Sequence, residues 1–283
     1  MRINTNVSSL TAQEAAKNTN NSISGSLEKL SSGLKINKAS DDASGLAIAD
    51  KLRTQVTSIN QGISNGNSAI ALLQIADKSM AEQSKILDTV KSKLIQANTA
   101  TTSADGRESI RKDIDKLLNQ LDNIAKQTNY NGTYLLQADA TSGTAAASTA
   151  HTFQIGEKTS DMINMSAVRA NTTGLTLTTL AGLATSGLTT AVAAAQQTVV
   201  DTAITTLNGY RGDIGSTQNQ VESAVRNLMT QSTNIKAAES VIRDVDYAEE
   251  SANFNKLNIV SQAGSYAISQ SNATQQNVLR LLQ

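Results

Sequence analysis

Residues 46–97, LAIADKLRTQVTSINQGISNGNSAIALLQIADKSMAEQSKILDTVKSKLIQA, carry the strongest pattern in the chain. Six of seven positions spaced seven residues apart are apolar in a row that consists of Leu52, Ile59, Gly66, Leu73, Met80, Leu87 and Leu94. An interleaved row begins apolar at Val56, Ile63 and Ile70 and turns polar at Asp77, Ser84 and Lys91. These rows predict one long helix that needs partner helices along its whole length.

Two further apolar rows lie far from this stretch in the sequence. The longer one consists of Leu207, Ile214, Val221, Leu228, Ile235 and Ile242. The shorter one consists of Ile110, Ile114, Leu117, Leu121 and Ile124. Because each row needs a partner, together they predict a helical bundle built from both halves of the chain.

Composition favours a thin, aliphatic core. Aromatic residues make up 2% of the 283 residues, and the chain contains neither Trp nor Pro. Aromatic side chains supply much of the buried area in compact cores, and Pro breaks helices. We therefore expect a mainly α protein: an elongated helical bundle or coiled coil built from both chain ends, with a small β-hairpin region.

Several functional classes are excluded or disfavoured by composition. The chain has no cysteine, so disulfides, thiolate metal sites and thiol nucleophiles are excluded. Its 24 basic and 24 acidic residues balance, which disfavours nucleic acid as a partner. No apolar run approaches the roughly 18 residues of a membrane span, and the N-terminus lacks an apolar signal core. We expect no membrane partner and no export by a cleaved general-secretion signal.

Both chain ends carry narrow apolar stripes. Helices of this kind are marginal alone in water, so we expect them to pair with each other and with neighbouring copies. After Glu250 only Lys256 and Arg280 are charged, which favours a packed environment. The predicted polymerisation residues are Ile3, Val7, Leu10, Ile23, Leu27, Leu30, Leu34, Leu257, Val260, Val278, Leu279, Leu281 and Leu282.

Helix boundaries have local signals. Ser40-Asp41-Asp42 and Ser103-Ala104-Asp105 supply short acceptors that predict helix starts. Asn131-Gly132 predicts a tight turn. Residues 153–156 and 162–165 flank a polar link and predict a β-hairpin. Residues 170–200 are uncharged and rich in Thr, so we place them on the solvent surface, with a mobile linker as the alternative.

Nothing in the sequence favours catalysis. His151 is the only histidine and lies in a low-complexity stretch, so we expect a solvent-exposed loop residue. The adjacent acids Asp41-Asp42 and Glu249-Glu250 suit helix starts better than acid–base chemistry. We expect no enzyme activity, no cofactor and no metal.

Several motifs together are diagnostic. Ser31-Ser32-Gly33-Leu34-Lys35-Ile36-Asn37 and the following residues 41–49, DDASGLAIA, resemble the N-terminal signature of bacterial flagellins. Residues 1–6 and 127–132 resemble it too. Residues 240–247, SVIRDVDY, and 276–282, QNVLRLL, resemble the C-terminal signature. The resemblance covers about residues 1–137 and 198–283.

The resemblance implies a subunit of the flagellar filament that is exported unfolded through the flagellar type III apparatus and polymerises outside the cell. It implies an inner-tube coiled coil from residues 1–40 and 247–283 and a helical outer tube from 41–137 and 198–246. Residues 138–197 would be a short exposed variable segment with the β-hairpin. Implied partners are further copies of the chain, an export chaperone, the filament cap and hook-junction proteins.

The resemblance is incomplete at a receptor motif. Flagellins that activate Toll-like receptor 5 carry an Arg and a Leu on the helix that aligns with residues 87–96, and a Glu on the next helix. Here Thr89 and Lys93 occupy the first two positions and Asp113 the third. Losing a guanidinium and placing a charge at an apolar contact both weaken an interface, so we expect a poor agonist.

Two other functions remain open. A hook–filament junction protein has related terminal arms but ends polymerisation after a short ring. A secreted adhesin would use the Thr-rich loop to bind a host surface. Unlimited self-assembly distinguishes the filament subunit from the first, and deletion of residues 138–200 tests the second.

Overall fold

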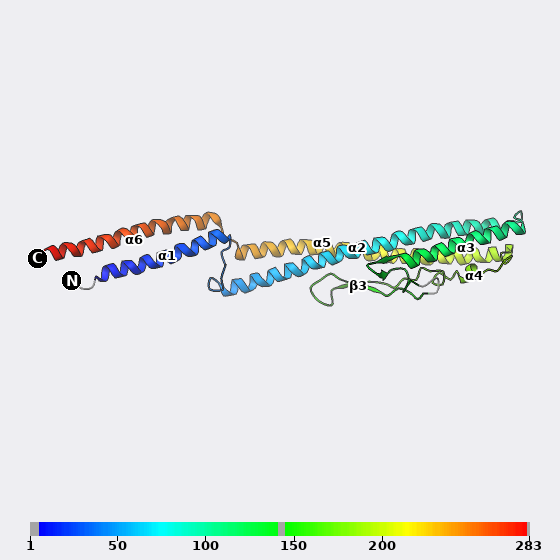
Figure 1. The fold of residues 1–283 in the computed structure, drawn as a ribbon, viewed down its shortest axis with the longest axis horizontal. Coiled ribbons are helices and arrows are strands. Elements are labelled where there is room, and N and C mark those ends of the chain that lie inside the picture. The colour runs from blue at the N-terminus through cyan, green and yellow to red at the C-terminus, as the bar shows by residue number, and fades with distance from the viewer. Residues whose placement is uncertain (1–5, 141–144, 282–283) are drawn as a thin grey trace. The chain divides into compact units, whose positions relative to one another are not determined.

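The computed structural model describes residues 6–140 and 145–281, with side chains described up to Gln276. The helices are α1 (Val7–Ser32), α2 (Ala43–Asn98), α3 (Ala104–Gln127), α4 (Thr178–Ala181), α5 (Thr190–Arg243) and α6 (Tyr247–Leu281). The strands are β1 (Asn129–Tyr130), β2 (Thr133–Tyr134), β3 (His151–Gln154) and β4 (Met162–Met165). The predicted mainly helical fold with small strand pairs is confirmed (Figure 1).

The chain divides into two compact units. One contains residues 1–56 and 233–283, and the other contains residues 57–232. The second unit holds most of the buried apolar residues, between α2, α3 and α5. The first apolar row of α2, which we call the α2 seam, is confirmed in this unit, because Leu73, Met80, Leu87 and Leu94 are each 0% exposed.

The polar interruption of the second α2 row has a structural explanation. Asp77 Oδ1 accepts a hydrogen bond of 2.8 Å from Arg211 Nε, and Lys91 Nζ lies 2.5 Å from Asp201 Oδ1. Both pairs join α2 to α5. The residue number rises from Asp77 to Lys91 along α2, while that of the partner falls from Arg211 to Asp201 along α5. The two helices are therefore antiparallel, with ion pairs where the row turns polar.

The buried face of α3 differs from the expected one. Ile110, Ile114 and Leu121 are buried as predicted, but Leu118 and Ala125 complete the face. Leu117 and Ile124 are only half-buried. The predicted row advances by 3.5 residues per turn on average, whereas a straight α-helix has 3.6 residues per turn. The buried row therefore takes a second step of four, from Ile114 to Leu118.

The local boundary signals are confirmed. Asp42 Oδ1 accepts the backbone N–H groups of Ser44 (3.0 Å) and Gly45 (2.9 Å) at the start of α2. Ser103 Oγ accepts the N–H of Gly106 at 3.1 Å at the start of α3. Asn131 and Gly132 have positive φ angles of 49° and 80° and join β1 to β2, as a two-residue hairpin turn requires.

The predicted β-hairpin is also confirmed, but the expectation for His151 is wrong. Strands β3 and β4 pair antiparallel, with Phe153 opposite Ile163 and His151 opposite Met165. His151 is thus a half-buried strand residue whose Nε2 is buried without a hydrogen-bond partner. This burial lowers the pKa of the imidazole, because desolvation disfavours its charged form.

Residues 170–200 lie on the surface only in part. Leu175, Leu177, Leu180 and Leu188 are buried, and α5 begins at Thr190. The placement on the solvent surface is wrong for these side chains, because a segment without charges can cover the apolar face that the three helices leave open.

Buried polar groups hold this covering segment in place. Gln83 is fully buried on α2, and its Nε2 donates to the carbonyl oxygens of Leu121 (3.1 Å) and Ala170 (2.8 Å). Asp122 accepts both the N–H and the hydroxyl of Thr172 at 2.8 Å each. Because buried polar groups are costly without partners, these bonds specify where the segment lies.

An ion pair on α3 and its hydrogen bonds fix the connection between α4 and α5. Arg111 donates to both carboxylate oxygens of Glu108 at 2.9 Å and, through Nη1, to the carbonyl of Leu183 at 3.1 Å. The N–H of Ser186 donates to Glu108 Oε2 at 2.9 Å. The Arg111 hydrogen bonds, followed by the Ser186 N–H, lower the pKa of Glu108 from its ordinary 4.5 to about 2.

Glu108→Gln is expected to lower the melting temperature at pH 7 and to lower it much less at pH 2. A carboxyl whose folded pKa is depressed adds stability above its unfolded pKa and loses it as the pH falls through the folded value. The difference between wild type and variant should therefore shrink between pH 4.5 and about 2. Thermal melts across this range test it, with the exposed Glu82→Gln as control; a gap that is as large at pH 2 as at pH 7 contradicts the assignment.

Within the part of the chain that the structure describes, no helix combines the length and the apolar character that crossing a membrane requires.

Candidate self-association surface

Helices α1 and α6 lie side by side in the unit formed by the two chain ends (Figure 1). The side chain of Asn6 caps α1 by accepting the N–H of Ser9 at 3.0 Å. Asp246 Oδ1 caps α6 by accepting the N–H groups of Ala248 (2.9 Å) and Glu249 (3.2 Å). Glu249 and Glu250 in the first turn of α6 complement the positive end of its helix dipole.

Polar side chains of the two helices bond to each other across the seam. Ser26 Oγ donates to Glu250 Oε1 at 2.5 Å, and Ser261 Oγ donates to Asn20 Oδ1 at 3.3 Å. Nearer the chain ends, Asn6 Nδ2 donates to Ser271 Oγ at 3.3 Å. Among the described residues of α1, the buried ones are Ser9 and Ser26.

Several large apolar side chains of the same helices are exposed. Val7 is 63% exposed and Tyr266 is 72% exposed, values that are high for such side chains. The exposed set on the described side chains of these two helices consists of Val7, Leu10, Leu27, Tyr247, Ile259, Val260 and Tyr266. Exposed apolar residues gathered on one element mark a surface that another molecule covers.

The predicted polymerisation residues fall into three groups. Val7, Leu10, Leu27 and Val260 are exposed. Ile23, Leu30, Leu34 and Leu257 are half-buried. Ile3 and Leu282 lie outside the described residues, as do the side chains of Val278, Leu279 and Leu281.

The signature after α1 forms a compact connector at the base of this pair. The N–H of Lys35 donates to the carbonyl of Arg243 at 2.6 Å, and the N–H of Val245 donates to that of Gly33 at 3.0 Å. Gly33 has a φ of 74°, and an added Cβ would lie 2.9 Å from Tyr247 Oη. Glycine is therefore required where α1 ends against the start of α6.

Charges stabilise the same connector. Lys38 Nζ lies 2.6 Å from Glu28 Oε2, and this hydrogen bond lowers the pKa of Glu28 and raises that of Lys38. The backbone N–H groups of Lys38 and Asn37 donate to Asp41 Oδ2 at 2.9 and 3.1 Å and lower its pKa. The acidic pair Asp41-Asp42 thus serves turn and helix-start formation.

The three receptor-motif positions lie on α2 and α3. Thr89 is exposed and donates its hydroxyl to the carbonyl of Lys85 at 2.9 Å. Lys93 Nζ lies 3.0 Å from Asp113 Oδ2 and joins the two helices. Two of the three positions therefore bind each other.

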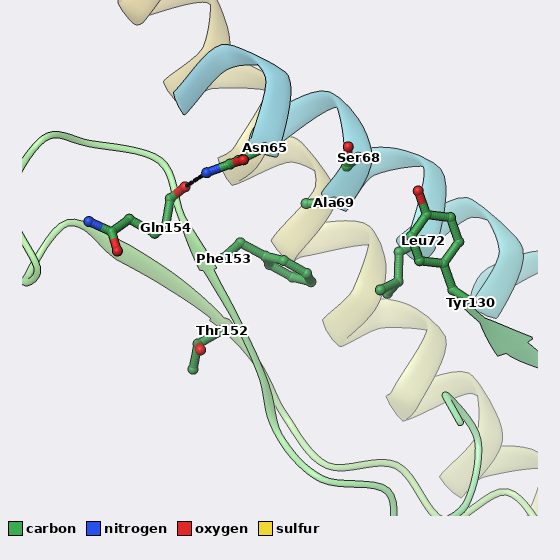
Figure 2. A pocket seen from close by; sticks show the side chains of 8 residues that line it. All are labelled: Asn65, Ser68, Ala69, Leu72, Tyr130, Thr152, Phe153 and Gln154. Carbon is green, nitrogen blue, oxygen red and sulfur yellow. Dashed lines mark hydrogen bonds between the residues drawn. The ribbon is translucent and has the colours of Figure 1, made fainter. Parts of the chain in front are cut away.

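A pocket of 290 Å³ lies between α2, β1 and β3 (Figure 2). Tyr130, Phe153 and Leu72 supply its apolar walls, and its lining contains no charged residue. Asn65 Nδ2 already donates to the carbonyl of Gln154 at 3.0 Å (Figure 2). Across the described residues, no three His, Cys, Asp or Glu side chains gather as metal ligands would. The pocket thus lacks the charged groups of a catalytic site.

Sequence reasoning missed part of this surface. The rows that it followed exclude Ile259 and Tyr266, and it did not find the polar partners across the seam. One signal was present: α6 is polar through Ser, Asn and Gln rather than through charge, which suits side chains that bond within a packed pair.

Comparison with known proteins identifies the family. Residues 3–141 match the family described as bacterial flagellin N-terminal helical region, and residues 197–282 match the bacterial flagellin C-terminal helical region. The chain belongs to the bacterial flagellin family. Its members are structural proteins of the flagellum, so the chain is a filament protein of the motility apparatus.

Full-length relatives support this assignment. The chain is 36% identical over 303 aligned residues to the flagellin of Bacillus subtilis strain 168, with 100% of both chains covered. It is 32% identical to the flagellar filament 30.7 kDa core protein of Treponema maltophilum, again over 100% of both chains. The flagellin family thus includes proteins that match this chain from end to end.

Solved structures agree. The crystal structure of Bacillus cereus flagellin is 28% identical, with a TM-score of 0.50 over 62% of this chain and 94% of that one. A putative flagellar hook-associated protein from Vibrio parahaemolyticus has a TM-score of 0.60 over 72% of this chain and 99% of that one. Its 11% identity shows a shared fold alone.

Proposed function

We propose that this chain polymerises into the flagellar filament through its α1–α6 pair. The observation that carries the proposal is the exposure of large Val, Leu, Ile and Tyr side chains on that pair. A second copy would remove this apolar surface from water, and each fully buried side chain of this size contributes about 1.5–3 kcal/mol. The partner is the same chain, because a homopolymer presents this surface at every position.

Export as an unfolded chain through the flagellar type III apparatus is part of the proposal, as is assembly outside the cell. The terminal pair has few buried side chains of its own, so it opens at low cost. The chain lacks Cys and Pro, so refolding at the filament tip needs no disulfide and no prolyl isomerisation. An export chaperone, the filament cap and hook-junction proteins are the further partners that this route requires.

Seeded polymerisation of purified chain tests the assembly proposal. The full chain should elongate seeds into long filaments, observed by light scattering and negative-stain electron microscopy. A chain without residues 1–40 and 247–283 should remain soluble. Filaments from the truncated chain would show that the terminal pair is not the assembly surface.

A hook–filament junction protein is the alternative function. A putative flagellar hook-associated protein shares this fold, so the fold does not distinguish the two functions. The same assay separates the two functions. Growth that stops at short rings supports the junction protein, and continued elongation supports the filament subunit.

Leu27→Gln is expected to raise the critical concentration for assembly by about tenfold or more, because a leucine that becomes buried between copies contributes about 1.5–3 kcal/mol. Leu27 is 55% exposed in the single chain, so the melting temperature of the soluble protein should not change. Sedimentation across a concentration series measures the effect, with exposed Ser31→Gln as control. Equal critical concentrations would remove Leu27 from the assembly surface.

We also propose that the chain is a weak agonist of Toll-like receptor 5. The residue types at the three receptor-motif positions support this, and so does the ion pair between Lys93 and Asp113. In that pair the carboxylate that a receptor would contact is already bound to Lys93. Thr89→Arg with Lys93→Leu should lower the half-maximal concentration in a reporter-cell assay by at least about tenfold, since hot-spot side chains are each worth about 2 kcal/mol.

The matched control for this variant is Thr54→Arg. Thr54 is also an exposed α2 threonine, and its hydroxyl donates to the carbonyl four residues earlier at 2.9 Å, as that of Thr89 does. A full response to the unaltered monomer, or an equal gain from Thr54→Arg, would contradict the proposal.

A further inference from the structure

We propose that the polar contacts across the α1–α6 seam determine the register of the terminal pair and keep the pairing within one chain. These contacts join Asn6 to Ser271, Asn20 to Ser261 and Ser26 to Glu250, and we call them the polar ladder. The inference deepens the proposed assembly function, because it explains which surface of the pair remains available to neighbouring copies.

An apolar seam would leave the register open. Apolar side chains specify a register only weakly, because one apolar side chain can pack where another one did. A polar side chain restricts the choice, because it loses its partner in every register but one. Buried polar residues fix helix register in coiled coils by this means.

A shift of one heptad breaks the polar ladder. Seven residues before and after Ser261 stand Phe254 and Ile268, so a shift in either direction places an apolar side chain opposite Asn20. Seven residues after Glu250 stands Leu257, which would face the hydroxyl of Ser26. Ser26 is only 4% exposed, so water does not replace the lost acceptor.

Small residues fix the distance between the helices. A Cβ built on Gly264 would lie 4.0 Å from the Cβ of Ala16, so the two backbones approach closely at this level. Phe254, Leu257 and Ile268 are half-buried at this face of α6, whereas Val7, Leu27 and Ile259 are exposed. The polar ladder and the small residues therefore set which faces of α1 and α6 pair within one chain, and the exposed apolar side chains stay on the outside of this pair.

A disulfide reporter tests this inference. The chain has no native cysteine, and the 4.0 Å separation lies within the range of about 3.5–4.5 Å between disulfide Cβ atoms. The parent for the experiment is therefore Ala16→Cys with Gly264→Cys. Its intramolecular disulfide is measured on non-reducing gels after equilibration in a glutathione buffer, and mass spectrometry confirms the linked peptides.

Two variants of this parent differ only in position. The ladder variant carries Asn20→Ala and Ser26→Ala. The control carries Asn21→Ala and Ser24→Ala, which removes the same residue types from α1 positions outside the polar ladder. Asn21 and Ser24 are exposed, as Asn20 is, and Ser24 donates its hydroxyl to the carbonyl of Asn20 in its own helix. Loss of helix stability by composition alone would thus affect both variants alike.

The ladder variant should lose at least about fivefold in the equilibrium constant for the intramolecular disulfide and should form disulfide-linked dimers, as expected when two net hydrogen bonds are lost. The control should match the parent. Equal intramolecular disulfide in ladder variant and control overturns the inference, as does a parent that forms no more intramolecular than intermolecular disulfide.

This result is separable from the assembly proposal. Pellet and supernatant of the seeded sample are analysed together, so the disulfide measurement does not depend on filament growth. Failure of the reduced parent to elongate seeds would count against the proposed function. Equal disulfide levels in the ladder variant and its control would count against the polar ladder only.

Discussion

Replacing Leu87 with alanine is expected to destabilise the protein by about 3 kcal/mol, within the range of about 2–5 kcal/mol for removing a buried leucine side chain. Leu87 is 0% exposed and lies in the middle of the α2 seam. The loss combines the transfer free energy of the removed methyl groups with the cavity that the long helices do not close. The melting temperature should fall by roughly 10 °C.

Ile95→Ala is the matched control for this prediction. Ile95 follows Leu87 on the same helix and is 52% exposed, so its truncation should change stability by no more than about 0.5 kcal/mol. Calorimetric melts of both variants in the soluble chain provide the comparison. Similar losses from the two variants would mean that the seam does not carry the stability of this unit.

Gly62→Ala is expected to destabilise the same unit by about 2 kcal/mol, because inserting atoms into a packed site forces the backbone to shift. A Cβ at Gly62 would overlap the carbonyl oxygen of Ile155, which directly follows β3. A backbone carbonyl has no alternative rotamer, so the β3–β4 hairpin must move away from α2. Hydrogen exchange should then increase in β3 and β4.

Gly209→Ala should have the opposite sign. Gly209 lies inside α5, and a Cβ there would meet no atom within 4 Å. Glycine costs about 1 kcal/mol relative to alanine in a helix interior, so this variant should be stabilised. If Gly62→Ala and Gly209→Ala changed the free energy of unfolding in the same direction, the close approach at Gly62 would be contradicted.

The Leu87 and Gly62 predictions show where sequence reasoning was strong and where it was incomplete. The seam around Leu87 was evident because a heptad row reports which residues share a helix face. The sequence also placed Gly62 in a long helix and predicted the β-hairpin, but it did not show that the two meet. That contact depends on residues more than ninety positions apart, which no local pattern reports.

The burial of leucines within residues 170–200 is a second feature that no local sequence pattern reported. Their lack of charge suggested a surface loop, yet Leu175, Leu177 and Leu180 cover the helical bundle. The aliphatic residues in this stretch follow neither the helical nor the strand period, so periodicity gave no signal of burial. Asp122 and Gln83 fix the segment through hydrogen bonds that the sequence does not predict.

The sequence by itself determined that the chain is helical, where α2 and α3 start, where the two hairpins turn and which family the termini belong to. These features depend on residues that are close together in the chain: caps, turns and apolar spacing. The tertiary structure alone decided which face of α1 and α6 is covered. An apolar stripe requires burial but does not specify a partner. Here Asn20, Ser26 and Ser261 bond across the seam, while Leu27 and Ile259 are exposed.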